Sequence, residues 1–302
     1  MNRRLFIRTS SLFLIGMATS DHLMHRLALA RPEDPVIFQG EEQFRGIIRK
    51  AEANVWKEKP IGELVGLIGL ELLGIPYVGG TLELSIDNEV CSANLLGLDC
   101  VTFYETVLGI ARIIKQNKSE PEDLLNELTF MRYRNGQITD YTSRLHYVGE
   151  WYSDNEAKEV VEDITSTLPE ATEYDKKINF MSTHSDAYKQ LKSHPELVEE
   201  IETIENDLNT IERYYLPKAY IEETEKNLQT GDIIAITTSI KGLDVSHTGL
   251  CYRDEDGRLR FLHASLDQKK VVLDTDLHEY IAGKKKQTGI MVARPIEIDA
   301  NQ

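Results

Sequence analysis

The sequence of 302 residues predicts an α+β fold in which helices come first and a small antiparallel sheet comes last. In the first half, apolar residues recur at helical spacing over residues 46–73 and again over 101–114. After residue 231 the pattern changes to short β-rich runs separated by turn residues. Helices followed by strands in this order are typical of α+β proteins.

The first helical stretch ends where Gly and Pro cluster at residues 74–80. Leu82 and Leu84 then indicate a brief extended segment. Asp99 precedes the next apolar periodic run, and Asp is a favourable N-cap residue because its side chain accepts hydrogen bonds from free helix N–H groups. The sequence therefore predicts a helix that begins at Cys100.

The middle of the chain, at about residues 156–212, is acidic and helical in pattern, and we expect its longest apolar stripe to belong to a surface helix with a solvated outer face. The strands expected after it are 232–237, 247–252, 258–264 and 271–273. No stretch rich in Pro, Gly or Ser divides the chain after Pro35. Residues 31–302 are therefore expected to form one domain with a helical insertion at 156–212.

Composition excludes several classes of protein. The chain has 34 Lys and Arg residues against 50 Asp and Glu residues, a formal charge of −16. A protein this acidic lacks the basic face that nucleic acid or an anionic lipid surface requires, so neither is an expected partner. No internal run approaches the ~20 apolar residues of a membrane helix, so no integral membrane segment is expected in the mature chain. Three cysteines are too few for a disulfide-built scaffold.

The amino terminus resembles a twin-arginine export signal. Arg3, Arg4 and Arg8 give it a positive start, residues 12–18 are mildly apolar, and residues 28–30 form an Ala-Leu-Ala cleavage pattern. The alternative is an amphipathic helix that packs on the domain. We expect residues 1–30 to be an export signal and the mature protein to be periplasmic.

A cysteine in the first turn of a helix is where a thiolate is most easily stabilised, because the free N–H groups and the helix dipole both lower the thiol pKa. Cys100 has this expected placement, which by itself fits a nucleophile and a packed thiol equally well. With Cys91 and Cys251 it makes an odd number of cysteines, so at least one stays unpaired unless it bridges to another chain.

Two histidines lie where neighbouring strands of an expected hairpin would bring them together. His247 begins one strand, a turn at residues 254–257 follows, and His263 lies near the end of the next strand. If paired residue numbers sum to 510, the two histidines lie directly opposite; a sum of 511 puts them on opposite faces. Gly257 can supply the left-handed residue of such a turn. Two adjacent histidines suit a base and the group that orients it.

Five pieces of the sequence, in this order, resemble the NlpC-type cell-wall amidases, which are bacterial papain-like cysteine hydrolases. The pieces are Pro76–Gly80, Leu98–Phe103, Gly231–Ile234, Ser246–Leu250 and Leu262–Ser265. The resemblance spans about 190 residues and is interrupted mainly by the acidic middle region. It implies a papain-like NlpC-type fold, with the helix that carries the cysteine packed on the small antiparallel sheet.

The resemblance also implies roles for individual residues. Cys100 matches the nucleophile, His247 the general base and His263 the third, orienting position. Tyr77 matches a tyrosine that lines the site, and Asp99, next to the nucleophile, is expected to contact substrate. No metal or cofactor is implied, and the sequence shows no clustered spacing of metal ligands.

Two departures from the common pattern resemble one branch of the family. Val101 and Thr102 replace the Ser-Gly pair that often follows the cysteine, and a long helical segment separates the two halves of the site. That branch comprises exported N-acetylmuramoyl-L-alanine amidases first catalogued as a domain of unknown function. Residues 144–151 resemble a region that shapes the branch's substrate cleft, although a packed helix start is an equal alternative. The substrate-binding candidates there are Arg144, His146, Glu150 and Trp151.

The resemblance implies a cysteine-dependent amidase that acts on muropeptides or peptidoglycan fragments and cuts the bond between the lactyl group and L-Ala. A D-Glu–diaminopimelate endopeptidase is the alternative within the family. A thiol acyltransferase on the same fold and a catalytically silent exported binding protein are alternatives from other classes. The run Lys284–Lys286 is interpreted as a solvated turn in preference to a glycan site.

Overall fold

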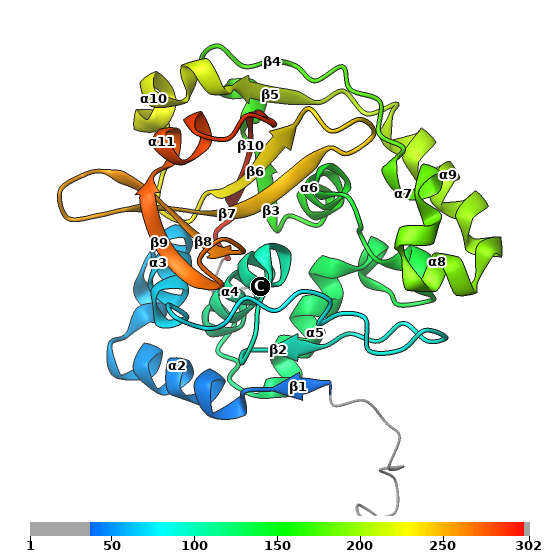
Figure 1. The fold of residues 1–302 in the computed structure, drawn as a ribbon. Helices are drawn as coiled ribbons and strands as arrows, with labels where there is room; N and C mark the ends of the chain where they lie inside the picture. The colour runs from blue at the N-terminus through cyan, green and yellow to red at the C-terminus, as the bar shows by residue number, and fades with distance from the viewer. Residues whose placement is uncertain (1–36, 299–302) are drawn as a thin grey trace, which may run out of the picture. The chain divides into compact units, whose positions relative to one another are not determined.

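Helices and an antiparallel sheet make up the computed structural model, which describes residues 37–298 (Figure 1). The predicted export signal at residues 1–30 lies outside the described residues. The α-helices of the described part are α2 (Glu41–Ala53), α3 (Ile61–Glu71), α4 (Cys100–Lys115), α5 (Pro121–Arg132), α6 (Val148–Ala157), α7 (Phe180–Thr183), α8 (Lys189–Ser193), α9 (Val198–Leu208), α10 (Ile221–Thr224) and α11 (Leu277–Ala282).

The main sheet has the strand order β4-β5-β10-β6-β7-β8-β9, and β3 also pairs with β10. All of its pairings are antiparallel. A separate two-residue parallel pair joins β1 to β2. The strands are β1 (Phe38–Gln39), β2 (Ala93–Asn94), β3 (Val161–Asp163), β4 (Thr172–Glu173), β5 (Tyr214–Pro217), β6 (Ile233–Thr238), β7 (Val245–Arg253), β8 (Leu259–Ser265), β9 (Lys270–Asp276) and β10 (Gln287–Pro295).

Apolar side chains alternate along the central strands and build a core on each face of the sheet. Leu250 and Leu262 belong to the same buried cluster as Phe103 and Val107 of α4, so this helix packs directly on the sheet. Phe261 points to the other face and joins a second cluster that includes Leu277 of α11. Burying each of these side chains stabilises the fold by about 1.5–3 kcal/mol. The sheet thereby holds α4 in place.

The first half differs from the predicted pattern in two places. The single helical stretch expected at residues 46–73 is divided into α2 and α3. Pro60 caps α3 and disfavours helical backbone in Lys59 before it, which is extended with ψ 151°. The extended segment expected at Leu82 and Leu84 forms no strand, because these residues lie in a surface loop.

The acidic middle region contains α7, α8 and α9, and it also carries the short strands β3 and β4 that extend the main sheet. Ile201 and Leu208 face inward from α9, as their spacing predicts. Glu205 departs from the expected solvated face, because its side chain is buried and accepts a hydrogen bond from the Tyr147 hydroxyl at 2.7 Å.

The pairing of β7 with β8 places His247 and His263 on the same face. It is shifted by two residues from the pairing that would put them directly opposite each other. Leu250 pairs with Leu262, so paired residue numbers sum to 512. Gly257 in the connecting turn has φ 81°, the left-handed conformation expected of it. His247 and His263 are therefore diagonal neighbours on one face, and long side chains can still meet at that separation.

Candidate active site

Cys100 is the first residue of α4, as the Asp99 cap predicts. Asp99 Oδ1 accepts hydrogen bonds from the backbone N–H of Val101 at 3.1 Å and of Thr102 at 2.8 Å. In return, the Asp99 N–H donates to Thr102 Oγ1 at 2.9 Å, which completes a capping box. The structure thus assigns Asp99 a local role, since it fixes the turn that carries the thiol.

The electrostatic surroundings of Cys100 oppose those that its helix position suggests. Burial, followed by the negative charge of Asp99, raises the pKa of the Cys100 thiol to about 11, although hydrogen bonds from Thr248 act in the opposite direction. The expected lowering of this pKa by the helix dipole is therefore outweighed. At neutral pH the side chain is a thiol, and its activation needs a base.

His247 and His263 meet in a direct contact between their rings. His247 Nε2 lies 2.7 Å from His263 Nδ1, and His263 Nε2 lies 3.4 Å from Asp274 Oδ2. Burial, followed by the neighbouring charge of His263, lowers the pKa of His247 to about 3. Burial also lowers the pKa of His263 to about 4, against the opposing effect of Asp274. Both rings are neutral at pH 7.

The partners of the two rings define their tautomers. Burial alone would raise the pKa of Asp274, but the Thr275 N–H and His263 outweigh it, so the carboxylate is ionised at neutral pH. An ionised carboxylate only accepts, so His263 carries its proton on Nε2 and presents an unprotonated Nδ1. His247 must then donate from Nε2, which leaves its Nδ1 unprotonated and able to act as a base.

Sequence reasoning missed Asp274 and Tyr280. Asp274 directly follows the apolar run predicted as a strand at 271–273, and β9 in fact continues to Asp276. Because His263 pairs with Val272, Asp274 lies diagonally across from His263. Pairing the expected strands would have revealed it. Tyr280 gave no local signal; its ring centroid lies 4.9 Å from that of His263 and 6.1 Å from that of His247.

The nucleophile candidate and the base candidate lie on elements that touch. Thr248, the residue after His247, donates from Oγ1 to the Cys100 carbonyl at 2.7 Å. This bond holds the start of β7 against the first turn of α4. In the described part of the chain, no hydrogen bond joins the Cys100 thiol to His247. Catalytic contacts of this kind often tighten only when substrate binds.

Tyr77 lies near Cys100, in the segment that pairs with the chain just before α4. Its N–H donates to the Lys269 carbonyl at 2.9 Å, and it forms a parallel β-bridge with Leu98. Burial, followed by the charges of Cys100 and Asp99, raises the pKa of Tyr77 to about 12. A protonated hydroxyl beside the thiol is able to donate a hydrogen bond to a substrate.

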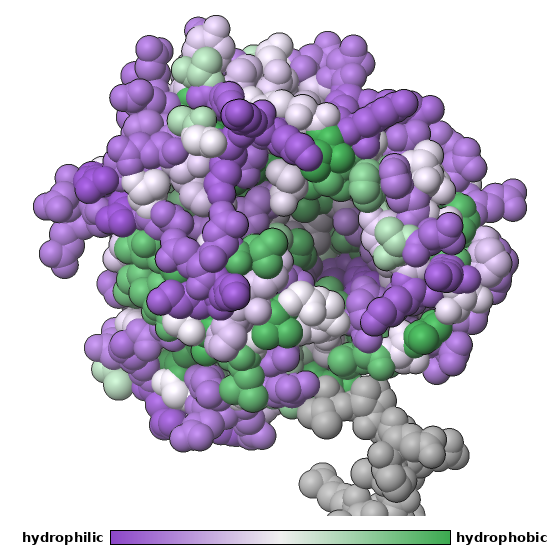
Figure 2. All heavy atoms as spheres, in the orientation of Figure 1, coloured by the Kyte–Doolittle hydropathy of each residue, from purple (hydrophilic) through white to green (hydrophobic). Residues whose placement is uncertain are grey.

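Arg144 is buried within a pair of acidic side chains. Its Nη2 donates to Glu83 Oε1 at 2.7 Å, its Nε lies 3.5 Å from Glu89 Oε1, and its guanidinium lies 5.0 Å from the Tyr141 ring centroid. Figure 2 shows that the face seen in Figure 1 is hollowed beside α4 and that hydrophilic side chains lie inside the hollow. Buried Arg144 Nε and Glu83 Oε2 have no hydrogen-bond partner among the described residues.

The other candidates from residues 144–151 serve mainly in packing. His146 Nε2 contacts the Tyr141 carbonyl at 2.8 Å, and burial lowers its pKa well below the ordinary value. Glu150 Oε1 accepts a hydrogen bond from Arg134 Nε at 3.0 Å. Trp151 is 1% exposed and belongs to the core. For this residue the packed helix start, which the sequence left as an alternative to a cleft, is the one observed.

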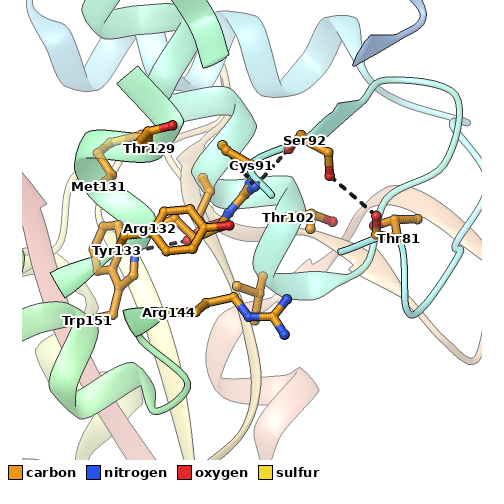
Figure 3. Close-up of polar contacts among 12 residues, drawn as sticks. Thr81, Cys91, Ser92, Thr102, Thr129, Met131, Arg132, Tyr133, Arg144 and Trp151 are labelled. Carbon is orange, nitrogen blue, oxygen red and sulfur yellow. Dashed lines mark hydrogen bonds and ion pairs between the residues drawn. The ribbon is translucent and has the colours of Figure 1, made fainter. Parts of the chain in front are cut away.

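A buried ion pair holds α4 to its neighbours (Figure 3). Arg132 Nε of α5 donates to Glu105 Oε2 of α4 at 2.8 Å, and Arg132 Nη1 donates to the Ser92 carbonyl at 2.7 Å. Trp151 Nε1 of α6 donates to Glu105 Oε1 at 3.1 Å. Figure 3 shows the Arg132 guanidinium directed toward Cys91 and Ser92, whereas that of Arg144 points away from them. The pair thus fixes the helix that positions Cys100.

Residues 37–298 contain no group of three or more His, Cys, Asp or Glu side chains arranged to hold a metal ion. Within the same range, no helix is both long and apolar enough to cross a membrane.

Comparisons with known proteins identify related chains. The AmiA-like family model, described as N-acetylmuramoyl-L-alanine amidase-like, matches residues 67–290. A crystal structure of an N-acetylmuramoyl-L-alanine amidase from Bacteroides uniformis is 35% identical, covers 78% of this chain and 99% of its own, and superimposes with a TM-score of 0.73. A Bacteroides fragilis structure described as a candidate xylanase is 38% identical. The match covers 76% of this chain and 99% of that one, with a TM-score of 0.70.

A more distant structure, protein LPG0564 from Legionella pneumophila, is 22% identical and has a TM-score of 0.64 over 85% of this chain and 95% of its own. At that identity it supports the fold alone. A comparison with curated protein sequences gave no match.

Proposed function

Because the chain belongs to the N-acetylmuramoyl-L-alanine amidase-like family, we propose that it is a cysteine-dependent hydrolase that cuts the amide bond between the lactyl group of N-acetylmuramic acid and L-Ala. Family membership supports an amidase with a peptidoglycan-related substrate. The observation that carries the finer proposal is the chain of contacts from His247 through His263 to Asp274, beside the helix that begins at Cys100.

The proposed reaction starts from two neutral groups. As the Cys100 sulfur attacks the carbonyl carbon, its proton passes to His247 Nδ1, and the imidazolium that forms donates through Nε2 to His263. Asp274 stabilises this positive charge from the far side of His263. His247 then returns the proton to the leaving nitrogen, so the peptide departs as an amine and a thioester remains. Water activated by the same imidazole hydrolyses the thioester.

The first turn of α4 supports the developing oxyanion. Asp99 occupies the N–H groups of Val101 and Thr102, and the Phe103 N–H donates to the Asp99 carbonyl at 2.9 Å. Among the N–H groups of this described turn, that of Cys100 is the one left without such a partner. It can donate to the oxyanion that forms on the carbon attacked by the sulfur of the same residue.

A glycosidase activity, which the Bacteroides fragilis relative's description suggests for that protein, would require two carboxyl groups on either side of the scissile bond. The site offers the Cys100 thiol and two neutral imidazoles, and its carboxylates have other partners. Asp99 caps α4, Asp274 contacts His263, and Glu83 and Glu89 are bound by Arg144. This chemistry favours acyl transfer. A D-Glu–diaminopimelate endopeptidase would use the same groups on another bond.

Digestion of a defined muropeptide, followed by mass spectrometry of the products, tests the proposal. We expect a free peptide that begins with L-Ala, together with intact N-acetylmuramic acid. Release of diaminopimelate-containing fragments from a substrate whose lactyl–L-Ala bond stays intact would contradict the choice of bond. Export, with cleavage before Arg31, stays a prediction from residues 1–30, and sequencing the amino terminus of protein from the native host tests it.

A further inference from the structure

A cavity of about 420 Å³ opens beside the proposed base. Its wall includes His247, the turn at residues 265–267, Tyr280 and the run Lys284–Lys286. Cavities of about 300–1,000 Å³ are typical of small-ligand sites. The run that the sequence indicated as a solvated turn therefore forms one wall of a hollow next to His247.

The three lysines differ in how their charges are compensated. Lys284 Nζ lies 2.6 Å from Asp267 Oδ2 and 5.4 Å from the Tyr280 ring centroid. Lys285 and Lys286 are exposed, and within residues 37–298 neither side chain forms an ion pair. Their backbone is nevertheless fixed, because the Lys286 carbonyl accepts hydrogen bonds from the Ser239 N–H at 2.8 Å and from Thr238 Oγ1 at 3.2 Å.

Part of the cavity wall is apolar. Leu266 is 64% exposed there, and Ile240 also lines the wall. A ligand that suits this surface carries negative charge toward the lysines and small apolar groups toward Leu266. The chain as a whole has a formal charge of −16, whereas this cavity wall carries two lysines that form no ion pair with a described residue. Their charge would attract an anionic ligand.

The proposed reaction determines which part of the substrate lies on this side. His247 must protonate the leaving nitrogen, so the leaving group lies against the imidazole. For the lactyl–L-Ala bond that group is the peptide, whose D-Glu and diaminopimelate residues carry free carboxylates. We propose that the cavity beside His247 is the subsite for the released peptide, and that Lys285 and Lys286 bind its carboxylates. This inference rests on the proposed function.

A paired-substrate experiment tests the role of the lysines. One substrate is N-acetylmuramoyl-L-Ala-γ-D-Glu-diaminopimelate, and the other is the same molecule with its carboxyl groups amidated. For the Lys285→Gln/Lys286→Gln variant, we expect KM for the free acid to rise by about tenfold, with kcat changed by less than about twofold, because two partly exposed charge contacts are lost. For the amidated substrate, the KM of this variant should equal the KM of the wild type.

A Lys192→Gln/Lys226→Gln variant is the matched control, because it removes the same charge from exposed positions outside the cavity. It should leave both KM values unchanged. The inference is overturned if the two double variants behave alike, or if KM rises equally for the acid and the amide.

A binding measurement separates failure of this inference from failure of the proposed function. The free peptide L-Ala-γ-D-Glu-diaminopimelate is titrated calorimetrically into the wild type and both double variants. Weaker binding to the Lys285→Gln/Lys286→Gln variant alone, by about tenfold, supports the peptide subsite even if no substrate is cut at the lactyl–L-Ala bond. Equal binding to all three proteins, or a lysine-dependent affinity for N-acetylmuramic acid instead of the peptide, refutes it.

Discussion

The contact between His247 and His263 should make folding stability depend on acid pH. Burial lowers the pKa of His247 to about 3 and that of His263 to about 4, whereas a histidine in an unfolded chain titrates near about 6.5. At low pH the unfolded protein therefore binds protons that the folded protein excludes. Because both folded-state pKa values lie below the unfolded value, this stability is complete above about pH 6.5 and is lost as the pH falls toward 3.

The size of the effect follows from proton linkage. At pH 5, the lowered pKa of one such histidine reduces the free energy of unfolding by about 2 kcal/mol. The two histidines together reduce it by at most about 4 kcal/mol. Urea unfolding at pH 7 and pH 5 measures this loss. A His247→Asn/His263→Asn variant is the control, since it keeps polar side chains that cannot titrate.

Between pH 7 and pH 5, the free energy of unfolding should fall by about 2–4 kcal/mol more in the wild type than in this variant. Carboxylates away from the two rings contribute equally to both proteins and cancel in the comparison. Asp274, whose pKa His263 helps to lower, stays ionised in the folded wild type over this pH range. Equal losses would show that the two imidazoles are not held neutral by burial, and would refute the charge states assigned to the site.

Three further predictions concern the thiol, the carboxylate and the buried ion pair. Asp274→Asn should lower kcat more than Asp274→Ala does, because an amide N–H directed at the neighbouring imidazole reverses its tautomer; equal losses on a muropeptide would contradict that assignment. Alkylation of Cys100 by iodoacetamide, followed by peptide mass spectrometry, should accelerate about tenfold per pH unit between pH 7 and pH 10, because burial raises the thiol pKa to about 11; a rate that is level above pH 7 would mean a low pKa. Arg132→Met should lower the free energy of unfolding by about 3–5 kcal/mol, because it leaves Glu105 buried without its partner, whereas Arg258→Met at an exposed pair should cost less than about 1 kcal/mol; similar costs for both would refute the role of the buried pair.

Local chemistry made part of the structure predictable from sequence. The start of α4 at Cys100 follows from the ability of Asp99 to accept hydrogen bonds from the N–H groups of Val101 and Thr102. The shared face of His247 and His263 follows from the alternation of side chains along paired strands. The exact offset of two residues depends on the turn and on packing, which short sequence patterns do not determine.

Features that depend on distant parts of the chain were not predictable. Arg144 pairs with Glu83 across 61 residues of sequence, and no local pattern connects them. Trp151 is the last residue of the region that resembles a substrate cleft, yet it is buried, and Glu105 on another helix accepts a hydrogen bond from its indole N–H. The pKa of Cys100 was expected to fall at a helix start, whereas burial by surrounding elements raises it. Each outcome is set by tertiary packing.

The most direct test of the account is turnover of one defined muropeptide by the wild type and by Cys100→Ala, with circular dichroism to confirm folding and mass spectrometry to identify products. The wild type should release peptide beginning with L-Ala, and Cys100→Ala should lower kcat by about 10³ or more. His247→Ala should cost nearly as much, and His263→Ala less, because it leaves the nucleophile and the base in place. Near-normal release of that peptide by folded Cys100→Ala would contradict the cysteine mechanism.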